Sequence, residues 1–155
     1  MATKYLYFWG HTPNRAGAVG AEGLSQGYPA PFGGGGVRFA SAEHYMMWGK
    51  AQLFGDTEAA EKILAARHPR QAKALGRSAV RGFDEETWVA NRLEIVTAGS
   101  VAKFRQNPDM LAFLLGTKNR VLVEASPMDR IWGIGLAADD ERAVAPRPDH
   151  DTWGV

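Results

Sequence analysis

The stretch from Ser41 to Gly116 constrains the fold most, because it is divided by residues that start and stop helices. Ser41, either Asp56 or Thr57, and Asp84 have side chains that commonly cap a helix N-terminus, and two acids follow Asp84. Gly55 stands where a first helix would end. These signals predict helices over residues 42–54, 57–67, 85–104 and 108–116.

Between the second and the third of these helices, the sequence predicts only a short turn. Pro69 follows His68, and a residue before proline avoids the helical backbone conformation. A turn through Ala72 and Leu75 would then end at Gly76.

Three short apolar segments are predicted to be strands. Lys4–Trp9 is rich in aromatic residues, Val37–Ala40 would form a hairpin with the segment around Phe32, and Val121–Val123 is the third. The length of 155 residues suits one domain with one core. We therefore expect an α+β protein, a mostly helical single domain over residues 1–155 around a small β-sheet.

A long loop is predicted between the first two strands. Residues 10–36 contain three prolines and the four glycines Gly33–Gly36, which we interpret as a flexible turn. Loops of this length in compact domains commonly carry function. The loop has neither a P-loop lysine nor a Gly-x-Gly-x-x-Gly series before a helix, so a Walker or Rossmann site is not expected.

The composition excludes several classes of function. The formal net charge of +1 gives no overall field to attract nucleic acid. The chain has no Cys, so it can form neither disulfides nor a thiolate nucleophile, and its four His lack the spacing of metal ligands. No apolar run reaches the roughly 20 residues of a membrane span. We expect a cytoplasmic protein that needs no metal and does not contact a membrane.

The first candidate for chemistry is the pair Glu43 and Lys50 on the first predicted helix. The two residues share one helix face with Met47, and Glu43 lies in the first turn, where the helix dipole stabilises a carboxylate. The alternative is a first-turn acid with a solvated lysine. The aromatic and methionine residues around them favour a buried helix, in which charges line a cavity or are paired.

Two further segments carry candidate residues. On the helix after Asp84, Trp88 and Lys103 fall close to one stripe, and Gly99 between them would permit another element to approach. Taken alone, a tryptophan such as Trp88 is more often a core residue than a surface for a ligand. After the third strand, Glu124 and Asp129 flank a loop that leads to Trp132. The alternative there is a surface turn at Asp129 and a core tryptophan.

Ordered blocks of residues along nearly the whole chain resemble the NADAR (YbiA-like) family. The blocks are Phe8-Trp9-Gly10, Phe39-x-Ser41-x-Glu43-His44-Tyr45, Lys50-Ala51, Pro69…Ala72-Lys73…Gly76-Arg77, Phe83-Asp84…Trp88, Ala102-Lys103-Phe104, Leu114-Leu115-x-Thr117, Val123-Glu124-Ala125-Ser126-Pro127-x-Asp129-x-Ile131-Trp132-Gly133-Ile134-Gly135 and Trp153-Gly154. The resemblance implies an α+β fold and hydrolysis of N-glycosidic bonds. The substrates it implies are phosphorylated ribosylamino-pyrimidines of riboflavin synthesis or ADP-ribose attached to guanine, free or in nucleic acid.

The same resemblance implies the roles of individual residues. Glu43, Asp129 and Trp88 match catalytic positions, with Glu43 as general base or cation stabiliser tuned by Lys50, and Asp129 as the second carboxylate. The positions that match the lining of the pocket are Lys50, Arg77, Lys103, Glu124 and Trp132. Among these, Arg77 and Lys103 would bind phosphate, while Trp88 and Trp132 would stack on the base. Neither a cofactor nor a metal is implied.

The sequence departs from the family pattern in two places. Gly23–Tyr28 replaces a Phe-Ser-Asn-Phe-like segment, which could change the contacts to the ribose or the base. The family pattern continues through an Asn-x-Leu-Gly helix, whereas this sequence ends at Val155. That helix is absent from this sequence or cut from it, and none of the candidate residues above comes from it.

Two other classes of function remain as alternatives. A non-catalytic ADP-ribose or NAD-binding module would use the same cations and tryptophans, but it would not need Glu43 and Asp129. A nucleic-acid-binding domain would use the basic residues between the second and third predicted helices, which a solvated helix face explains equally well. These residues are Arg67, Arg70, Lys73, Arg77 and Arg81. The oligomeric state is left open.

Overall fold

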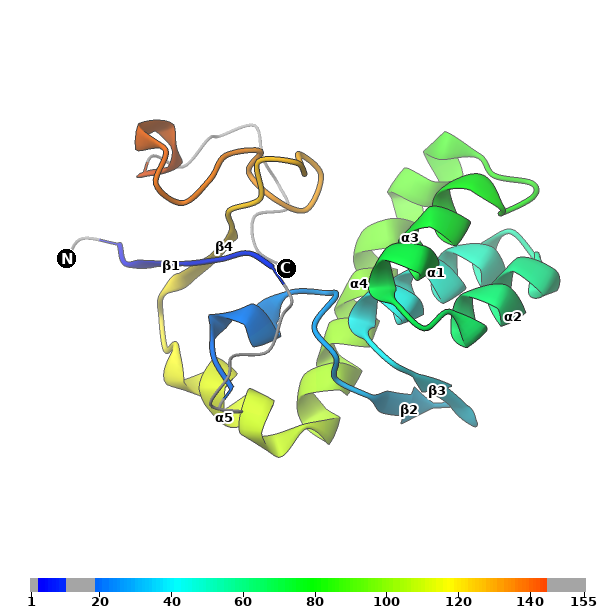
Figure 1. The fold of residues 1–155 in the computed structure, drawn as a ribbon, viewed down its shortest axis with the longest axis horizontal. Coiled ribbons are helices and arrows are strands. Elements are labelled where there is room, and N and C mark those ends of the chain that lie inside the picture. Colours follow the sequence, from blue (N-terminus) through cyan, green and yellow to red (C-terminus); the bar gives the residue numbers. More distant parts are fainter. Residues whose placement is uncertain (1–2, 11–18, 145–155) are drawn as a thin grey trace. The chain divides into compact units, whose positions relative to one another are not determined.

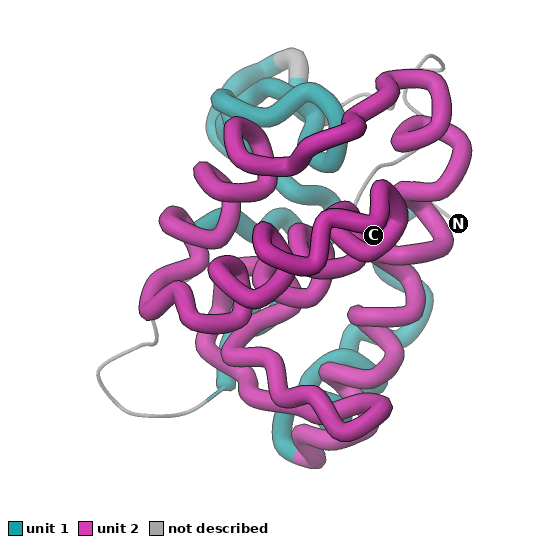
Figure 2. Tube along the Cα trace, turned by 90° about the vertical axis from the view of Figure 1, so that its right-hand side faces the viewer, with its two compact units in different colours: residues 1–25, 109–155 teal, residues 26–108 magenta. Residues whose placement is uncertain are grey.

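The computed structural model describes residues 3–10 and 19–144 of the chain. The chain divides into two compact units (Figure 2). Unit 1 comprises residues 1–25 and 109–155, and unit 2 comprises residues 26–108.

Unit 2 contains a hairpin followed by helices (Figure 1). Its elements are β2 (Phe32–Gly34), β3 (Val37–Phe39), α1 (Ala42–Leu53), α2 (Thr57–Ala65), α3 (Pro69–Ser78) and α4 (Glu85–Gln106). The side chains of Ser41, Asp56 and Asp84 each accept a hydrogen bond from a backbone N–H in the first turn of α1, α2 and α4. The predicted starts of these three helices are thus confirmed.

The hairpin forms because the glycines allow a tight turn. Strands β2 and β3 are antiparallel, with Phe32 opposite Phe39, as the sequence predicted. Gly35 and Gly36 join them with φ values of +59° and +81°, a pair of positive angles that L side chains rarely adopt. The turn therefore occupies Gly35 and Gly36, while the other two glycines of the run belong to β2.

Helix α3 corrects the prediction of a short turn at this place. The segment forms a helix of 10 residues that begins at Pro69. Proline is favoured at the first helical position, where its missing N–H has no intrahelical partner to lose. Gly76 is accommodated because it faces Met47 of α1, and an added Cβ would collide with the sulfur of that methionine. Proline and glycine thus support α3 where sequence reasoning took them as helix breakers.

Helices α1 and α4 pack closely through two glycines. An added Cβ at Gly49 of α1 would lie 2.7 Å from Cγ2 of Ile95, and one at Gly99 of α4 would collide with the ring of Tyr45. The predicted close approach at Gly99 is confirmed, and Tyr45 is the residue that approaches. The later residue of α1 contacts the earlier residue of α4, so the two helices are antiparallel. The first turn of α1 therefore lies beside the end of α4.

An aromatic core anchors the hairpin to α1. Phe32 and Phe39 are each 1% exposed, with ring centroids 5.4 Å apart. The Phe39 ring also lies 4.9 Å from Tyr45 and 5.1 Å from Trp48, both in edge-to-face arrangements. This core supports the N-terminal turn of α1, where Glu43 lies.

Unit 1 is built on a parallel strand pair. Strand β1 (Tyr5–Phe8) pairs with β4 (Val121–Glu124), so that Phe8 lies opposite Glu124. The unit also contains η1 (Ala21–Leu24), α5 (Pro108–Gly116, which starts at the boundary of the units) and η2 (Glu141–Val144). Its core includes Val123, Ile134, Leu136 and Ala143.

The predicted α+β class is confirmed, with helices outweighing two separate two-stranded sheets in the described residues. The predicted loop over residues 10–36 contains η1 and β2, and its residues 11–18 lie outside the described part. The predicted C-terminal loop contains η2, and its residues from 145 onward are also outside the described part. Among the described residues, no helix is long and apolar enough to cross a membrane.

Candidate functional site

The first turn of α1 holds a buried carboxylate. Glu43 is 8% exposed, and its backbone N–H donates to the carbonyl oxygen of Gln26 at 2.9 Å. Its place in the first turn puts the carboxylate near the positive end of the helix dipole, which stabilises the charged form. This helix is largely buried, in agreement with the prediction from its apolar flanks.

His44 fixes the position of this helix end, a role that sequence reasoning missed. His44 is 1% exposed, its Nδ1 lies 2.7 Å from Ser41 Oγ, and its Nε2 lies 2.9 Å from the carbonyl oxygen of Ala66. A carbonyl oxygen can only accept, so Nε2 carries a proton and donates it to the Ala66 carbonyl oxygen. The N-terminus of α1 is thereby tied to the end of α2. The three-residue spacing from the capping serine was the available signal.

Lys50 lies further along α1 than Glu43, and aromatic rings enclose it. It is 8% exposed, and its Nζ lies 4.6 Å from the ring centroid of Phe83 and 5.3 Å from that of Trp88. No hydrogen-bond acceptor of the described residues reaches this ammonium group. Its N–H donors are therefore available to a ligand.

Burial lowers the pKa of Lys50 from its ordinary value. The negative charge of Glu85 opposes this shift, whereas the positive charge of Arg77 adds to it. Glu85, at the start of α4, is thus a carboxylate whose charge acts on Lys50, while the pairing of Lys50 with Glu43 stays a prediction. An incoming anion would favour the charged form of Lys50 in the same way.

Trp88 and Phe83 form the walls around Lys50. Trp88 is 9% exposed, so it is a core residue that also presents its ring to the ammonium group. Phe83 is 43% exposed and packs edge-to-face on Phe54, with ring centroids 5.4 Å apart. Phe83 was not among the predicted site residues.

Arg77 and Lys103 differ in their surroundings. Arg77 is exposed on α3, and its positive charge contributes to the lowered pKa of Lys50, whose ammonium group lies over the ring of Trp88. Lys103 is 0% exposed on the face of α4 that also carries Gly99. Burial lowers the pKa of Lys103 to about 7.

Asp129, Glu124 and Trp132 belong to one loop of unit 1. Oδ1 of Asp129 accepts from the backbone N–H of Ile131 at 2.8 Å and from that of Trp132 at 3.0 Å, which fixes the turn after β4. Gly133 lets this turn close, because an added Cβ there would lie 2.9 Å from the carbonyl oxygen of Asp129. The three predicted residues are half-buried. Asp129 therefore has a structural role in the turn, whatever else its second oxygen does.

A model of the NADAR domain matches residues 7–154. The chain belongs to the NADAR family.

Similar proteins agree with this assignment. The chain is 44% identical over 140 residues to a protein named N-glycosidase R617 of Acanthamoeba polyphaga mimivirus, covering 87% of this chain and 80% of the viral one. It is 40% identical over 78 residues to the riboflavin biosynthesis protein PYRR of Arabidopsis thaliana, covering 48% of this chain and 13% of the plant protein. The NMR structure of YbiA from E. coli matches with a TM-score of 0.69 and 26% identity, over 86% of this chain and 73% of YbiA.

The NADAR match spans both units, and the predicted site residues are divided between them. Those in unit 2 are Glu43, Lys50, Arg77, Trp88 and Lys103, and those in unit 1 are Glu124, Asp129 and Trp132. No group of three His, Asp or Glu side chains gathers as a metal site within residues 3–10 and 19–144.

Proposed function

We propose that this NADAR chain hydrolyses the bond between a ribose C1″ and a nitrogen of a phosphate-bearing, nucleotide-derived substrate. Its coarser activity is that of a hydrolase acting on N-glycosyl bonds, the activity for which its relative R617 is named. The observation that carries the finer proposal is Lys50, an enclosed cation with free donors beside the exposed cation Arg77. This pair suits a phosphate or diphosphate group.

Cleavage of the C1″–N bond requires stabilisation of positive charge on the sugar. As the nitrogen leaves with the bonding electron pair, C1″ becomes oxocarbenium-like and water adds to it. We assign Glu43 to this carbon, where it stabilises the cation or takes the proton of the attacking water. The leaving nitrogen takes up a proton, so that the products are a ribose hydroxyl and the free amine. Burial of Glu43 strengthens its electrostatic effect because less water screens it.

Lys50 and Arg77 are assigned to the substrate phosphates. The rings of Phe83 and Trp88 hold the Lys50 ammonium in place, so little freedom is lost when it binds an anion. Trp88 thus acts in our proposal through Lys50, more than as a free stacking surface. Phe83, which is partly exposed, is the better surface for a flat base.

The loop residues and Lys103 complete the assignment. We assign Asp129 as the second carboxylate, which orients ribose hydroxyls or water through its other oxygen, and Trp132 as a wall against the base. Glu124 and Lys103 are assigned to the lining of the pocket. These roles rest on the family match of each position, and the two carboxylates separate an enzyme from a non-catalytic ADP-ribose-binding module.

The family resemblance implies two substrate types. One is ADP-ribose attached to guanine, and the other is a ribosylamino-pyrimidine phosphate, in line with the name of the riboflavin biosynthesis protein of Arabidopsis. The experiment is to incubate the full chain separately with ADP-ribosyl-guanosine and with the pyrimidine compound, and to identify products by mass spectrometry. Release of the free base or amine from one of them, and none by the Glu43→Gln variant, supports the proposal. No release from either substrate contradicts it.

A further inference from the structure

Gln26 joins two helices of unit 2 at the turn that carries Glu43. Its backbone carbonyl oxygen accepts from the Glu43 N–H at 2.9 Å, and its side-chain Nε2 donates to Ser100 Oγ at 3.3 Å. The first contact belongs to the first turn of α1, and the second belongs to the C-terminal half of α4. One residue outside both helices therefore bonds to each of them.

The backbone contact occupies an N–H group that α1 itself leaves open. The first turn of an α-helix contains N–H groups without an intrahelical acceptor. In α1 the Ser41 hydroxyl oxygen accepts from the His44 N–H, and the Gln26 carbonyl oxygen accepts from the preceding N–H of Glu43. These two bonds fix the backbone that carries the Glu43 side chain. A shift of the Gln26 backbone would therefore loosen this turn.

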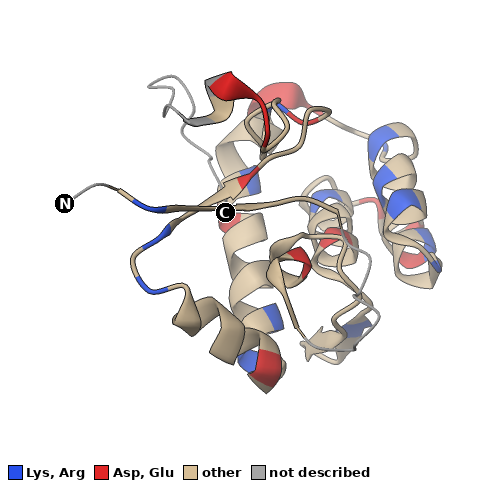
Figure 3. Ribbon diagram, turned by 60° about the vertical axis from the view of Figure 1, so that its left-hand side comes forward, with Lys and Arg blue, Asp and Glu red and all other residues tan. Residues whose placement is uncertain are grey.

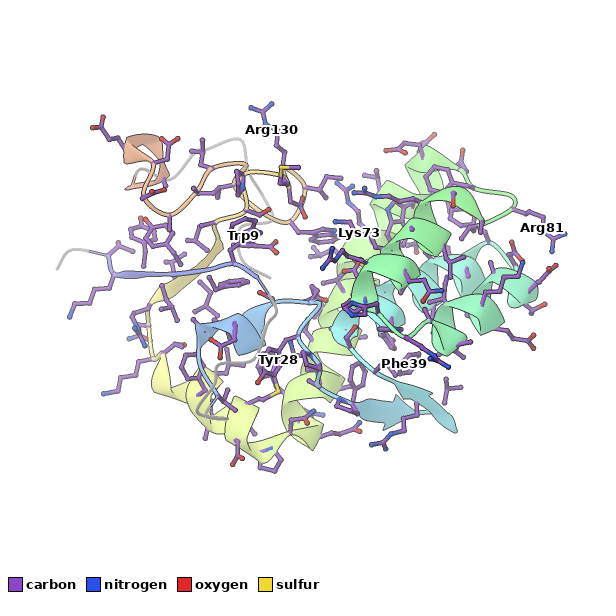
Figure 4. The ribbon with its side chains drawn as sticks, viewed as in Figure 1. Trp9, Tyr28, Phe39, Lys73, Arg81 and Arg130 are labelled. Carbon is purple, nitrogen blue, oxygen red and sulfur yellow. The ribbon has the colours of Figure 1, made fainter. Side chains whose placement is uncertain are left out.

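The segment that follows Gln26 is held in place although it forms neither a helix nor a strand before β2. Tyr28 in this segment is 9% exposed (Figure 4). Near its end, the Pro31 carbonyl oxygen accepts from the side chain of Asn107, the C-cap of α4, at 3.3 Å. At its start, the hydrogen bond between Gln26 and Ser100 is the corresponding contact with α4. The segment is thus attached to α4 near both of its ends.

The side-chain contact also relates Glu43 to Lys103. Ser100 and Lys103 are three residues apart on α4, so they are neighbours on one side of that helix. Glu43 is 8% and Lys103 is 0% exposed, and Figure 3 draws acids such as Glu43 in red and cations such as Lys103 in blue. Gln26 therefore joins the turn with the buried acid to the part of α4 with the buried cation.

We propose that Gln26 is a positioning residue, which fixes the Glu43 carboxylate for its action at C1″ through its bonds to Glu43 and Ser100. This inference rests on the proposed function, in which Glu43 acts at that carbon. Gln26 lies in Gly23–Tyr28, where the sequence departs from the family pattern, so the family match does not supply this role. A shift of about 1 Å in a catalytic group can cost on the order of 10²-fold in rate.

The test removes the side-chain bond from either end. Gln26→Leu nearly keeps the size of the side chain and loses the donor, whereas Ser100→Ala loses the acceptor. Ser100→Thr keeps a hydroxyl group. The matched control is Gln106→Ala, which breaks the two hydrogen bonds of another glutamine to the backbone of Gly33, at 2.8 Å and 2.7 Å. This control joins α4 to β2 and leaves both contacts of Gln26 in place.

Two quantities are measured on the full chain. The first is kcat and KM on whichever of ADP-ribosyl-guanosine and the pyrimidine phosphate the native protein hydrolyses. The second is the amide hydrogen exchange of the Glu43 N–H, followed by NMR, which does not require turnover. The Ala59 N–H, which the Asp56 carboxylate caps in α2, is the internal reference.

Gln26→Leu and Ser100→Ala are each expected to lower kcat about tenfold and to change KM less than about twofold, because Glu43 is misplaced while the contacts to the phosphates remain. The double variant should be no worse than either single variant, since both changes remove the same bond. The Glu43 N–H should exchange about fivefold faster in both, with the Ala59 N–H unchanged. Ser100→Thr and Gln106→Ala should resemble the native protein in both measurements.

Two results would overturn the inference and leave the proposed function intact. One is a normal kcat in both single variants of a protein that hydrolyses its substrate. The other is an equal loss of kcat in Gln106→Ala, since the effect would then follow from a general loosening of unit 2. Faster exchange of the Glu43 N–H in the two variants, with no hydrolysis of either substrate by the native protein, supports the bridge through Gln26 and contradicts the proposed function.

Discussion

Glu43 combines burial with a position at a helix N-terminus, and it is the residue whose charge we expect the reaction to need most. Glu43→Gln keeps the size of the side chain and removes its charge and its basicity. We predict that kcat on the accepted substrate falls by about 10²-fold or more, the range for a positioned acid–base group, while the dissociation constant changes less than about tenfold. Single-turnover kinetics and calorimetry would measure both. A variant with nearly normal turnover would remove Glu43 from the mechanism.

Asp129 has two separable functions, because one oxygen already holds the turn at Ile131 and Trp132. Asp129→Asn keeps an acceptor for these N–H groups, whereas Asp129→Ala removes it. We predict that both variants lose about 10²-fold in kcat and that only the alanine variant also loses thermal stability. Thermal unfolding and kcat would be measured on the same samples. If Asp129→Asn were as active as the native protein, the carboxylate would have only its role in the turn.

At the scale of elements, Asp56 joins the start of α2 to the segment before α4. Its carboxylate accepts one hydrogen bond from the backbone N–H of Ala59 at 3.1 Å and another from the backbone N–H of Arg81 at 2.8 Å. These hydrogen bonds, with the Arg81 guanidinium, lower the pKa of Asp56 to about 2. Between about pH 4 and pH 2, the Asp56 carboxylate is still charged in the folded state, whereas in the unfolded chain it is already taking up a proton. Its contribution to stability is therefore complete above about pH 4 and is lost as the pH falls toward 2.

We predict that Asp56→Asn lowers the Tm at pH 7 by roughly 4 °C, through the weaker cap and the lost ion pair. The difference in Tm between the native protein and the variant should shrink as the pH is lowered from 5 to about 2. Thermal unfolding followed by circular dichroism over that range would measure it, with Glu61→Gln, an exposed acid on the same helix, as the control. A difference that did not depend on pH would contradict the linkage.

The helix boundaries were predictable from local signals, whereas the surroundings of Lys50 were not. A cap such as Ser41 bonds within its own helical turn, so a few neighbouring residues of the sequence are enough to predict it. The failure at α3 has a local cause as well, because Pro69 and Gly76 have opposite effects at different positions of a helix. Only contact with Met47, far away in the sequence, explains why glycine is accommodated at position 76.

The site was predictable as a set of residues but not as an arrangement. Resemblance to a family supplied Lys50, Trp88 and Arg77 one by one, while their grouping depends on how α1, α3 and α4 pack. Phe83 was missed because an exposed aromatic before a helix cap has no sequence signature of its own. Likewise, His44 was judged only as a metal ligand, and its hydrogen bond to Ala66 joins segments 22 residues apart.

At the scale of the whole molecule, the residues that we assign to the activity are divided between the two units. The NADAR match covers residues of both units, and the assigned carboxylates Glu43 and Asp129 come from different units. Experiments on substrate choice therefore need the whole protein and not unit 2 alone. The size of the ligand is the property that best separates the two substrate types, since ADP-ribose has a diphosphate and a second nucleoside half that a ribosylamino-pyrimidine monophosphate lacks.

If the substrate is ADP-ribosyl-like, free ADP-ribose should bind the native protein with micromolar affinity in titration calorimetry. Lys50→Met, which keeps the length of the enclosed stem, should weaken binding by at least about tenfold, because a hydrogen bond to a charged group is worth about 1.5–3 kcal/mol. Arg77→Ala should weaken it by only about fivefold, since solvent screens this exposed cation. Arg38→Ala, an exposed change on β3, serves as the control and should leave the affinity unchanged. No detectable binding at millimolar ADP-ribose, together with turnover of the pyrimidine phosphate, would assign the site to the smaller substrate.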